Sequence, residues 1–247
     1  MSKIGIYDSG SGGLSILKEL LSNIDGDVYY YGDSLNNPWG NKSKEDIYTY
    51  LIKISDWFKQ NGVTKIITGC NTSLSFFEKE LESIFNQPVL NILNNSNANY
   101  KDKSYSVLLT ENSCKNKLFS KLLRDKVIDE VACPNLANLI ENNKIEEATK
   151  KAIKFIKQCR YENIILGCTH YPLIQKNIEQ HFPSFRFINP ATFINYKTRR
   201  SQTYPKIHFK VTGSETLFLK NLSNIIELET FVLNNKSIKL EQSVITS

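Results

Sequence analysis

The chain has 247 residues, of which 40% are hydrophobic and 23% are charged, and its formal net charge at pH 7 is +6. Such a chain is long and apolar enough for one large or two modest domains with hydrophobic cores. No apolar segment approaches the roughly 20 residues of a transmembrane helix, and the basic residues are spread along the chain, so we expect neither a membrane span nor a nucleic-acid partner.

Apolar runs alternate with helical patterns in the first part of the chain. The segment 42–62 has the apolar spacing of an amphipathic helix, and Gly62 stands where such a helix ends. In chain order, the pattern predicts a strand at 3–7, a turn at 8–13, a helix at 14–24, a strand at 27–33, a helix at 42–62, a strand at 64–68 and a helix at 73–85.

The same alternation returns in the second part of the chain. It predicts a strand at 104–109, a helix at 143–159, a strand at 162–166 and a helix at 171–182. Apolar strands that alternate with helices favour an α/β fold with largely parallel sheets flanked by helices. In such sheets, ligands bind beyond the carboxyl ends of the strands.

Two stretches of the sequence are alike. The segments "KIITGCNT" at 65–72 and "NIILGCTH" at 163–170 both place Gly-Cys directly after an apolar strand. The repetition predicts two similar α/β domains facing one another across a cleft. The polar segment 86–106 is the expected passage between them, and 203–211 is expected to bring the chain back. We therefore expect a first domain at 1–93 plus 205–247 and a second domain at 94–204.

The cysteines as a group indicate a reducing compartment. Five cysteines without a regular spacing do not form a disulfide framework. The N-terminal residues enter strand-like sequence at once, so we expect no signal peptide and a cytoplasmic protein with free thiols. Cys114, Cys133 and Cys159 lie in helical or featureless contexts, and we interpret them as structural because cysteine is commonly buried.

Cys70 and Cys168 differ from the other cysteines because each follows a strand and precedes a predicted helix. The positive end of a helix dipole favours the thiolate at such a position. A zinc site with His170 is one interpretation, but the chain has no CxxC or HExxH spacing. A thiol hydrolase with Cys70 as nucleophile and His170 as base is another, but it leaves Cys168 unexplained.

Two equivalent thiols on opposite walls of a cleft suit a symmetric reaction better. Inverting a carbon stereocentre by proton transfer needs a base on one face of the carbon and an acid on the other. A thiol and a thiolate exchange these roles when the reaction runs backwards. Cys70 and Cys168 are therefore candidate acid–base groups, and Asn71, Thr72 and Thr169 beside them are candidate ligands for the polar ends of an amino acid.

The stretch "YDSGSGG" at 7–13 supplies further polar groups after the first strand. It resembles a dinucleotide-binding turn, and Asp33 falls about 20 residues further on as that fingerprint requires. Ser15 replaces the third glycine, however, so the match is weak. The alternative is an exposed turn in which Ser9 and backbone N–H groups hold a carboxylate while Asp8 meets an amine or orients a catalytic group.

Several motifs, in order through most of the chain, resemble those of glutamate racemases, in the cofactor-independent aspartate/glutamate racemase superfamily. They are "GIYDSGSGGLSILKEL", "YYYGDSLNNPWGNKS", "GCNTS", "ACPNLANLIE", "ILGCTHYPL" and, near the end, "VTGSETLFLKNL". The resemblance implies a two-base reaction without metal or another cofactor. It implies that Cys70 and Cys168 exchange protons with the two faces of the α-carbon, with Asp8 assisting Cys70 and His170 assisting Cys168.

The resemblance also implies which residues bind the substrate. They are Asp8, Ser9, Trp39, Gly40, Asn71, Thr72, Ser113, Thr169 and His170. Glu141 matches an acidic position near the histidine, and we count Glu141 and Asp33 as auxiliary. Trp39 replaces the usual Tyr, and only Thr110 and Ser113 keep the hydroxyls of a Thr/Ser-rich substrate loop.

The function expected from the resemblance is interconversion of L- and D-glutamate by a cytoplasmic homodimer. Its biological use would be D-glutamate for peptidoglycan, and thus cell-wall biogenesis and cell shape. Two alternatives remain, which are a racemase for aspartate or another amino acid and a non-catalytic or regulatory member of the family.

Overall fold

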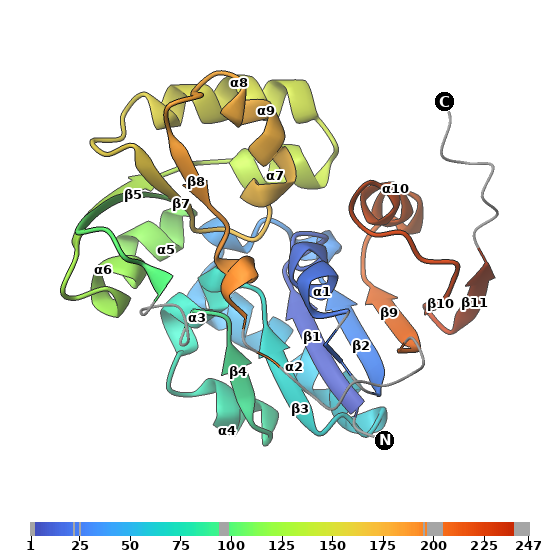
Figure 1. The fold of residues 1–247 in the computed structure, drawn as a ribbon. Helices are drawn as coiled ribbons and strands as arrows, with labels where there is room; N and C mark the ends of the chain where they lie inside the picture. The colour runs from blue at the N-terminus through green and yellow to red at the C-terminus, as the bar shows by residue number, and fades with distance from the viewer. Residues whose placement is uncertain are drawn as a thin grey trace.

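The structure, a computed structural model, describes residues 3–21, 23–24, 26–93, 99–194, 196 and 205–239. Within these ranges the strands form two sheets, one of seven strands and one of four. Figure 1 shows the two sheets as separate layers, each flanked by helices. This arrangement confirms the predicted fold class of two largely parallel, helix-flanked sheets.

The larger sheet contains strands from both ends of the chain. They are β1 (Lys3–Asp8), β2 (Asp27–Gly32), β3 (Lys65–Thr68), β4 (Val89–Asn91), β9 (Ile207–Val211), β10 (Thr230–Leu233) and β11 (Lys236–Lys239). Their order is β11-β10-β9-β2-β1-β3-β4, and only the β10–β11 pair is antiparallel. Beyond Lys3, every residue of β1 is buried, as a strand covered on both faces requires.

The smaller sheet is parallel throughout and comes from the middle of the chain. Its strands, in the order β6-β5-β7-β8, are β5 (Ser104–Leu109), β6 (Val127–Ala132), β7 (Asn163–Leu166) and β8 (Arg186–Ile188). Alternate residues of β5 enter different clusters, because Tyr105, Val107 and Leu109 join the core of the larger sheet while Leu108 packs on the other face. One core therefore runs from the larger sheet into the smaller one.

The helices flank both sheets. Beside the larger sheet are α1 (Leu14–Leu20), α2 (Lys44–Gln60), α3 (Asn71–Phe77), α4 (Leu81–Phe85) and α10 (Glu215–Ile225). The others are α5 (Glu111–Lys115), α6 (Leu118–Leu122), α7 (Leu136–Glu141), α8 (Ile145–Ile156) and α9 (Gln175–Glu179). Helices α1 and α10 contact each other and lie side by side (Figure 1). Among the described residues, no helix has the length and apolar composition to span a bilayer.

Local sequence signals explain the longest helix. Ser43 caps α2 by accepting from the Asp46 N–H at 3.0 Å, and the Asp46 side chain accepts from the Ser43 N–H in return. Ile47 and the later apolar positions of its inner face are buried. Gly62 has φ +69° just after the helix ends, which confirms its predicted terminating role.

Two segments predicted as single continuous helices are each interrupted in the structure. The segment 73–85 divides at a turn over 78–80 into α3 and α4, and 171–182 begins as a 3-10 helix, η4 (Tyr171–Ile174), before α9. Neither break contains a glycine, and the apolar spacing of Leu74, Phe77 and Leu81 reads as continuous. All three side chains are buried, so the apolar positions face inward on both sides of the break.

The two sheets draw their strands from different parts of the chain. The larger sheet uses strands from residues 3–91 and 207–239, and the smaller sheet uses strands from 104–188. β9 pairs with β2, so the chain does return to the first sheet. The boundaries at 93/94 and 204/205 remain our proposal, since the adjoining residues 94–98 and 197–204 lie outside the described part of the chain.

Candidate active site

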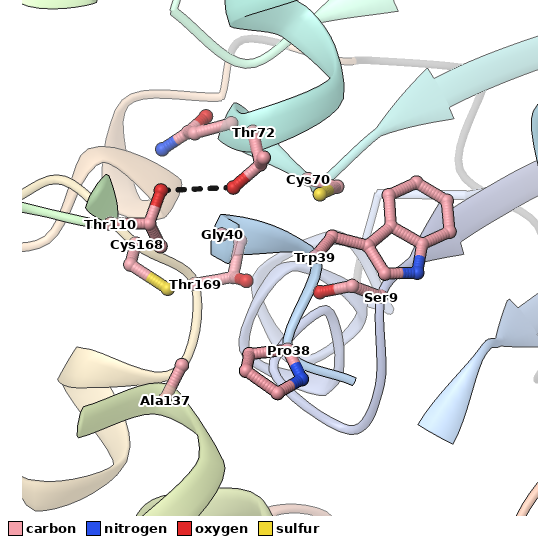
Figure 2. A pocket seen from close by; sticks show the side chains of 11 residues that line it. Ser9, Pro38, Trp39, Gly40, Cys70, Thr72, Thr110, Ala137, Cys168 and Thr169 are labelled. Carbon is pink, nitrogen blue, oxygen red and sulfur yellow. Dashed lines mark hydrogen bonds between the residues drawn. The ribbon is translucent and has the colours of Figure 1, made fainter. Parts of the chain in front are cut away.

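The carboxyl ends of strands from both sheets meet at one cavity. It is lined by Ser9, Pro38, Trp39, Gly40, Cys70, Asn71, Thr72, Thr110, Ala137, Cys168 and Thr169. Ser9 follows β1, Cys70 follows β3, Thr110 follows β5 and Cys168 follows β7. Cys70 and Cys168 thus reach the cavity from different sheets (Figure 2).

Cys70 is a buried thiol rather than a ready thiolate. It stands at the N-cap of α3 and is 3% exposed. Burial, together with the charge of Asp8, raises the pKa of Cys70 to about 12. The expectation that the helix dipole would favour the thiolate is therefore wrong for this residue, because burial in a low-dielectric site outweighs the dipole.

Cys168 belongs to a chain of three side chains. Its Sγ lies 3.8 Å from Nδ1 of His170, and Nε2 of His170 lies 2.9 Å from Oε2 of Glu141. His170 is 1% exposed and Glu141 is 4% exposed. This is the geometry in which a carboxylate orients an imidazole toward a thiol. The contact between Glu141 and the histidine, implied by the family resemblance, is present.

Glu141 is held as an ion by donors from the first part of the chain. Oε2 accepts from the Ser11 N–H at 2.8 Å and from Ser11 Oγ at 2.6 Å, while Oε1 accepts from Ser34 Oγ at 2.6 Å. Burial acts to raise the pKa of Glu141, but the hydrogen bond to His170 and those from the serines outweigh it and lower the pKa well below its usual range.

The electrostatics of His170 follow from the same contacts. Burial acts to lower the pKa of His170, and the hydrogen bonds to Cys168 and Glu141 overcome this and raise the pKa above its ordinary value. The ionised Glu141 can only accept a hydrogen bond. Nε2 of His170 therefore carries a hydrogen atom and is the donor in its hydrogen bond to Glu141. Nδ1 is thus the nitrogen that faces Cys168.

Asp8 is a buried carboxyl on the Cys70 side. It accepts from the Gly10 N–H at 3.1 Å and from Thr169 Oγ1 at 3.0 Å. Burial raises the pKa of Asp8 to about 6, although the charge of His170 and the hydrogen bond from Thr169 lower it. Asp8 and Cys70 cannot both ionise cheaply, so near neutral pH Cys70 keeps its proton while Asp8 is the group that ionises.

The glycines at positions 10, 12 and 13 allow residues from the second half of the chain to approach the end of β1. A Cβ on Gly10 would lie 2.7 Å from the Glu141 carboxyl, and one on Gly12 would lie 2.5 Å from Nδ1 of His170. The expectation of an exposed turn is wrong, since Ser9 is 7% exposed and the turn is buried under these side chains. Its Ser11 N–H serves the carboxylate of Glu141, and its glycines serve close packing.

Gly12→Ala tests this packing directly. The added methyl group would also lie 2.7 Å from Thr169 Oγ1, so the imidazole of His170 must shift. We expect a loss of about 1–3 kcal/mol in the free energy of unfolding, measured by denaturant titration. Glu19→Ala, on the exposed side of α1, is the control and should leave stability nearly unchanged. A Gly12→Ala variant as stable as the parent contradicts the close packing.

Asp33 organises the loop that carries Trp39 and does not line the cavity. It accepts from Trp39 Nε1 at 3.1 Å, from Thr212 Oγ1 at 2.7 Å and, at both of its carboxylate oxygens, from Asn36 Nδ2. Trp39 is 1% exposed. The departure from the usual Tyr therefore retains a hydrogen-bond donor, which is engaged by Asp33.

Hydroxyl and amide groups join the two sheets around the cavity. Thr72 and Thr110 lie 3.0 Å apart through their Oγ1 atoms (Figure 2), and Asn71 donates to the Gly167 carbonyl at 3.0 Å. Ser113 is fully buried behind Thr110, whose hydroxyl donates to Ser113 Oγ at 2.9 Å. Ser113 therefore supports the cavity wall without lining it.

The structure gathers most of the predicted site residues and adds others. Ser9, Trp39, Gly40, Asn71, Thr72, Thr169 and both cysteines line the cavity, with Asp8, His170 and Glu141 in contact behind them. The residues not predicted to belong to the site are Pro38, Ala137, Ser11, Ser34 and Asn221. The roles of all these residues stay predictions. Among the described residues, no three His, Cys, Asp or Glu side chains are grouped to hold a metal ion.

The chain is similar to several known proteins. The Asp/Glu/Hydantoin racemase model matches residues 25–194. A glutamate racemase of Carboxydothermus hydrogenoformans is 32% identical over 241 residues, covering 90% of this chain and 91% of the relative. The structure of glutamate racemase from Aquifex pyrophilus has a TM-score of 0.68 at 27% identity, covering 94% of this chain and 98% of that one.

A further solved structure supports the fold. Glutamate racemase from Campylobacter jejuni has a TM-score of 0.79 at 24% identity, covering 91% of this chain and all of that chain. The family model spans more than half of the chain, and the similarity to curated relatives extends over nearly its whole length. The chain therefore belongs to the Asp/Glu/Hydantoin racemase family.

Proposed function

We propose that the protein is a glutamate racemase that interconverts L- and D-glutamate by moving a proton between the α-carbon and Cys70 or Cys168. The observation that carries the proposal is that these two thiols, from strand ends of different sheets, line one cavity. A thiol on each side of a bound α-carbon provides the acid and the base that inversion needs.

The two thiols differ in how they would be activated. For Cys168, an imidazolium at His170 stabilises a negative charge on sulfur through the Sγ–Nδ1 contact of 3.8 Å. For Cys70, burial favours the neutral thiol, so Asp8 must take up the proton when Cys70 acts as base. In each direction, one sulfur removes the α-proton, the carbon becomes a planar carbanion, and the other thiol donates its proton from the opposite face.

The polar lining suits an amino acid. Ser9, Asn71, Thr72, Thr110 and Thr169 present hydroxyl and amide groups to the cavity, and such groups bind carboxylates and ammonium groups by hydrogen bonds. The cavity volume is only about 10 Å³, roughly the room that one water occupies. We propose that the two sheets and their helices separate to admit the substrate and close around it.

The other features of the proposal rest on the family resemblance. They are a reaction that needs no metal or other cofactor, a cytoplasmic homodimer, and a supply of D-glutamate for peptidoglycan. Several curated relatives are named glutamate racemases, which supports glutamate as the substrate. A racemase for aspartate or another amino acid is the nearest alternative, and a thiol hydrolase or a non-catalytic binding protein is more distant.

The deciding experiment incubates the purified protein with L-glutamate and, separately, with D-glutamate in deuterated water. We expect formation of the opposite enantiomer from either side and deuterium at the α-position of the product. Racemisation assays with aspartate and other amino acids test the alternative of a different amino-acid substrate. An assay of ester and amide cleavage tests the alternative of a thiol hydrolase. Binding of glutamate without deuterium incorporation contradicts the proposal and favours a non-catalytic member.

A further inference from the structure

Asn221 is a polar residue on the buried face of α10, between Phe218 and Leu222. It is 6% exposed. Its Nδ2 donates to Ser11 Oγ at 3.0 Å and to the backbone carbonyl of Glu141 at 2.9 Å. Glu141 is the last residue of α7, where backbone carbonyls lack partners within the helix. The amide thus connects α10 to both the glycine turn and the end of α7.

The chemistry of the amide fixes the direction of the hydrogen bonds. An NH2 group only donates, so Ser11 Oγ accepts from Asn221 and directs its own proton to Oε2 of Glu141, 2.6 Å away. Oε2 also receives the Ser11 N–H at 2.8 Å. These two Ser11 donors help to keep Glu141 ionised, and an ionised carboxylate can only accept.

An accepting Glu141 fixes the imidazole in turn. Nε2 of His170 must donate across the 2.9 Å contact, which leaves Nδ1 as the nitrogen that exchanges a proton with Cys168. With the opposite polarity, Nδ1 of a neutral imidazole would carry the proton and lose its capacity to accept from the thiol. Asn221 thus orients the Ser11 hydroxyl that supports the ionised Glu141, and Glu141 in turn orients His170 toward the sulfur.

We propose that Asn221 is a positioning residue for the Cys168 half of the reaction, setting the tautomer of His170 through Ser11 and Glu141. The inference rests on the proposed racemase function. Ser11 and Asn221 belong to the elements of the larger sheet and Glu141 to those of the smaller one. The Nε2-protonated tautomer of His170 is therefore supported by these contacts only when the two sheets lie together. This couples the reactivity of Cys168 to the closing of the two sheets around the substrate.

The test uses the isosteric substitution Asn221→Asp in the full-length protein. A carboxylate keeps the shape of the amide but only accepts, so the hydroxyl of Ser11 turns away from Glu141. Asn221→Leu removes the donors without adding charge. Asn224→Asp, at an exposed position of the same helix, is the matched control for the added charge.

The first measurement is the 15N NMR spectrum of the imidazoles, which needs no substrate. The chain has three histidines, and His181 and His208 serve as internal references for His170. The ionisable side chains that act on His170 are Cys168, Glu141 and Asp8. At a pH above the folded pKa of His170, where the ring is neutral, we expect the Nε2-protonated signature of His170 in the parent and in Asn224→Asp. In both Asn221 variants, the Nδ1 and Nε2 shifts should move toward each other.

The second measurement is the rate of racemisation in deuterated water. We expect kcat to fall about tenfold or more in the Asn221 variants, as for other residues that orient a reacting histidine. KM should change little. The loss should be confined to the direction of α-proton exchange that Cys168→Ser blocks. Thermal unfolding of each variant confirms that it is folded.

The outcomes separate the inference from the proposed function. If the parent does not racemise glutamate, the proposed function fails, while the spectra still test the positioning of His170. If either folded Asn221 variant keeps the parent His170 spectrum, or slows both directions of exchange equally, the inference is wrong. If Asn221→Leu does not fold, the isosteric Asn221→Asp decides alone. If neither variant folds, Asn221 is a structural residue and the inference is overturned.

Discussion

Replacing Cys70 or Cys168 with serine is expected to lower the interconversion of L- and D-glutamate by roughly 10²-fold to 10⁴-fold, the range for loss of a general acid or base. A serine hydroxyl retains the size and hydrogen bonding of the thiol but is a far weaker acid. The variant therefore keeps the cavity and loses proton transfer on one face of the α-carbon.

The direction of the block distinguishes a two-base mechanism from any mechanism with one base. In deuterated water, the two variants should be impaired in opposite directions, since each retains the thiol that the other lacks. Deuterium should therefore enter the α-position from only one enantiomer in Cys70→Ser and from only the other in Cys168→Ser. Exchange is measured by proton NMR of each pure enantiomer before any product accumulates.

The remaining cysteines supply the control. Cys159 follows α8, is only partly buried and is not among the residues that line the cavity. Cys159→Ser should racemise glutamate at the parent rate. Parent rates in both Cys70→Ser and Cys168→Ser would overturn the two-thiol mechanism. An equal loss of exchange from both enantiomers in each variant would indicate one nucleophile and one structural cysteine.

The sequence predicts the positions of the two thiols better than their chemistry. Apolar strands followed by Gly-Cys place Cys70 and Cys168 at strand ends, and both do line the cavity. The effect of a helix N-terminus on Cys70 is local and visible in the sequence. Burial is not, because it depends on the second sheet closing over the thiol, and here it determines the raised pKa of Cys70.

The residues that hold Glu141 show the limit of sequence reasoning most clearly. Ser11 is 130 residues from Glu141, and Ser34 is 107 residues from it. Asn221 is 210 residues from Ser11. A serine in a glycine turn and an asparagine in an amphipathic helix are ordinary in their local contexts. Only an amide on the otherwise apolar face of 215–225 offered a signal, and its partners depend on the closed arrangement of the two sheets.

Glu141→Gln should reduce racemisation by roughly 10²-fold to 10⁴-fold, by analogy with residues that orient a catalytic histidine. In the parent, both carboxylate oxygens of Glu141 accept hydrogen bonds, Oε1 from Ser34 and Oε2 from Ser11 and His170. An amide has one oxygen, so its NH2 group must face a donor at one of these two positions. The variant therefore loses the tautomer of His170 or the contact with Ser34.

The pH dependence provides an independent measurement of the same carboxylate. The pKa of Glu141 is lowered from 4.5 to about 2, since the bond to His170 outweighs burial. An acid with a lowered pKa stabilises the fold above its unfolded pKa and loses this contribution as the pH falls through its folded pKa. The parent should therefore be more stable than Glu141→Gln at pH 5 to 7, and the difference should narrow between about pH 4.5 and pH 2.

The opposite sign holds for His170, whose pKa is raised above 6.5 in the parent. The stabilisation of the fold by His170 is complete at a pH below 6.5 and is lost as the pH rises through the folded pKa. Removing the charge of Glu141 lowers the pKa of His170, so the alkaline limb of the rate profile should move to lower pH. Glu147→Gln, at an exposed position of α8, is the control and should leave activity and its pH profile unchanged. A Glu141→Gln variant with the parent pH profile would show that His170 acts on Cys168 independently of this carboxylate.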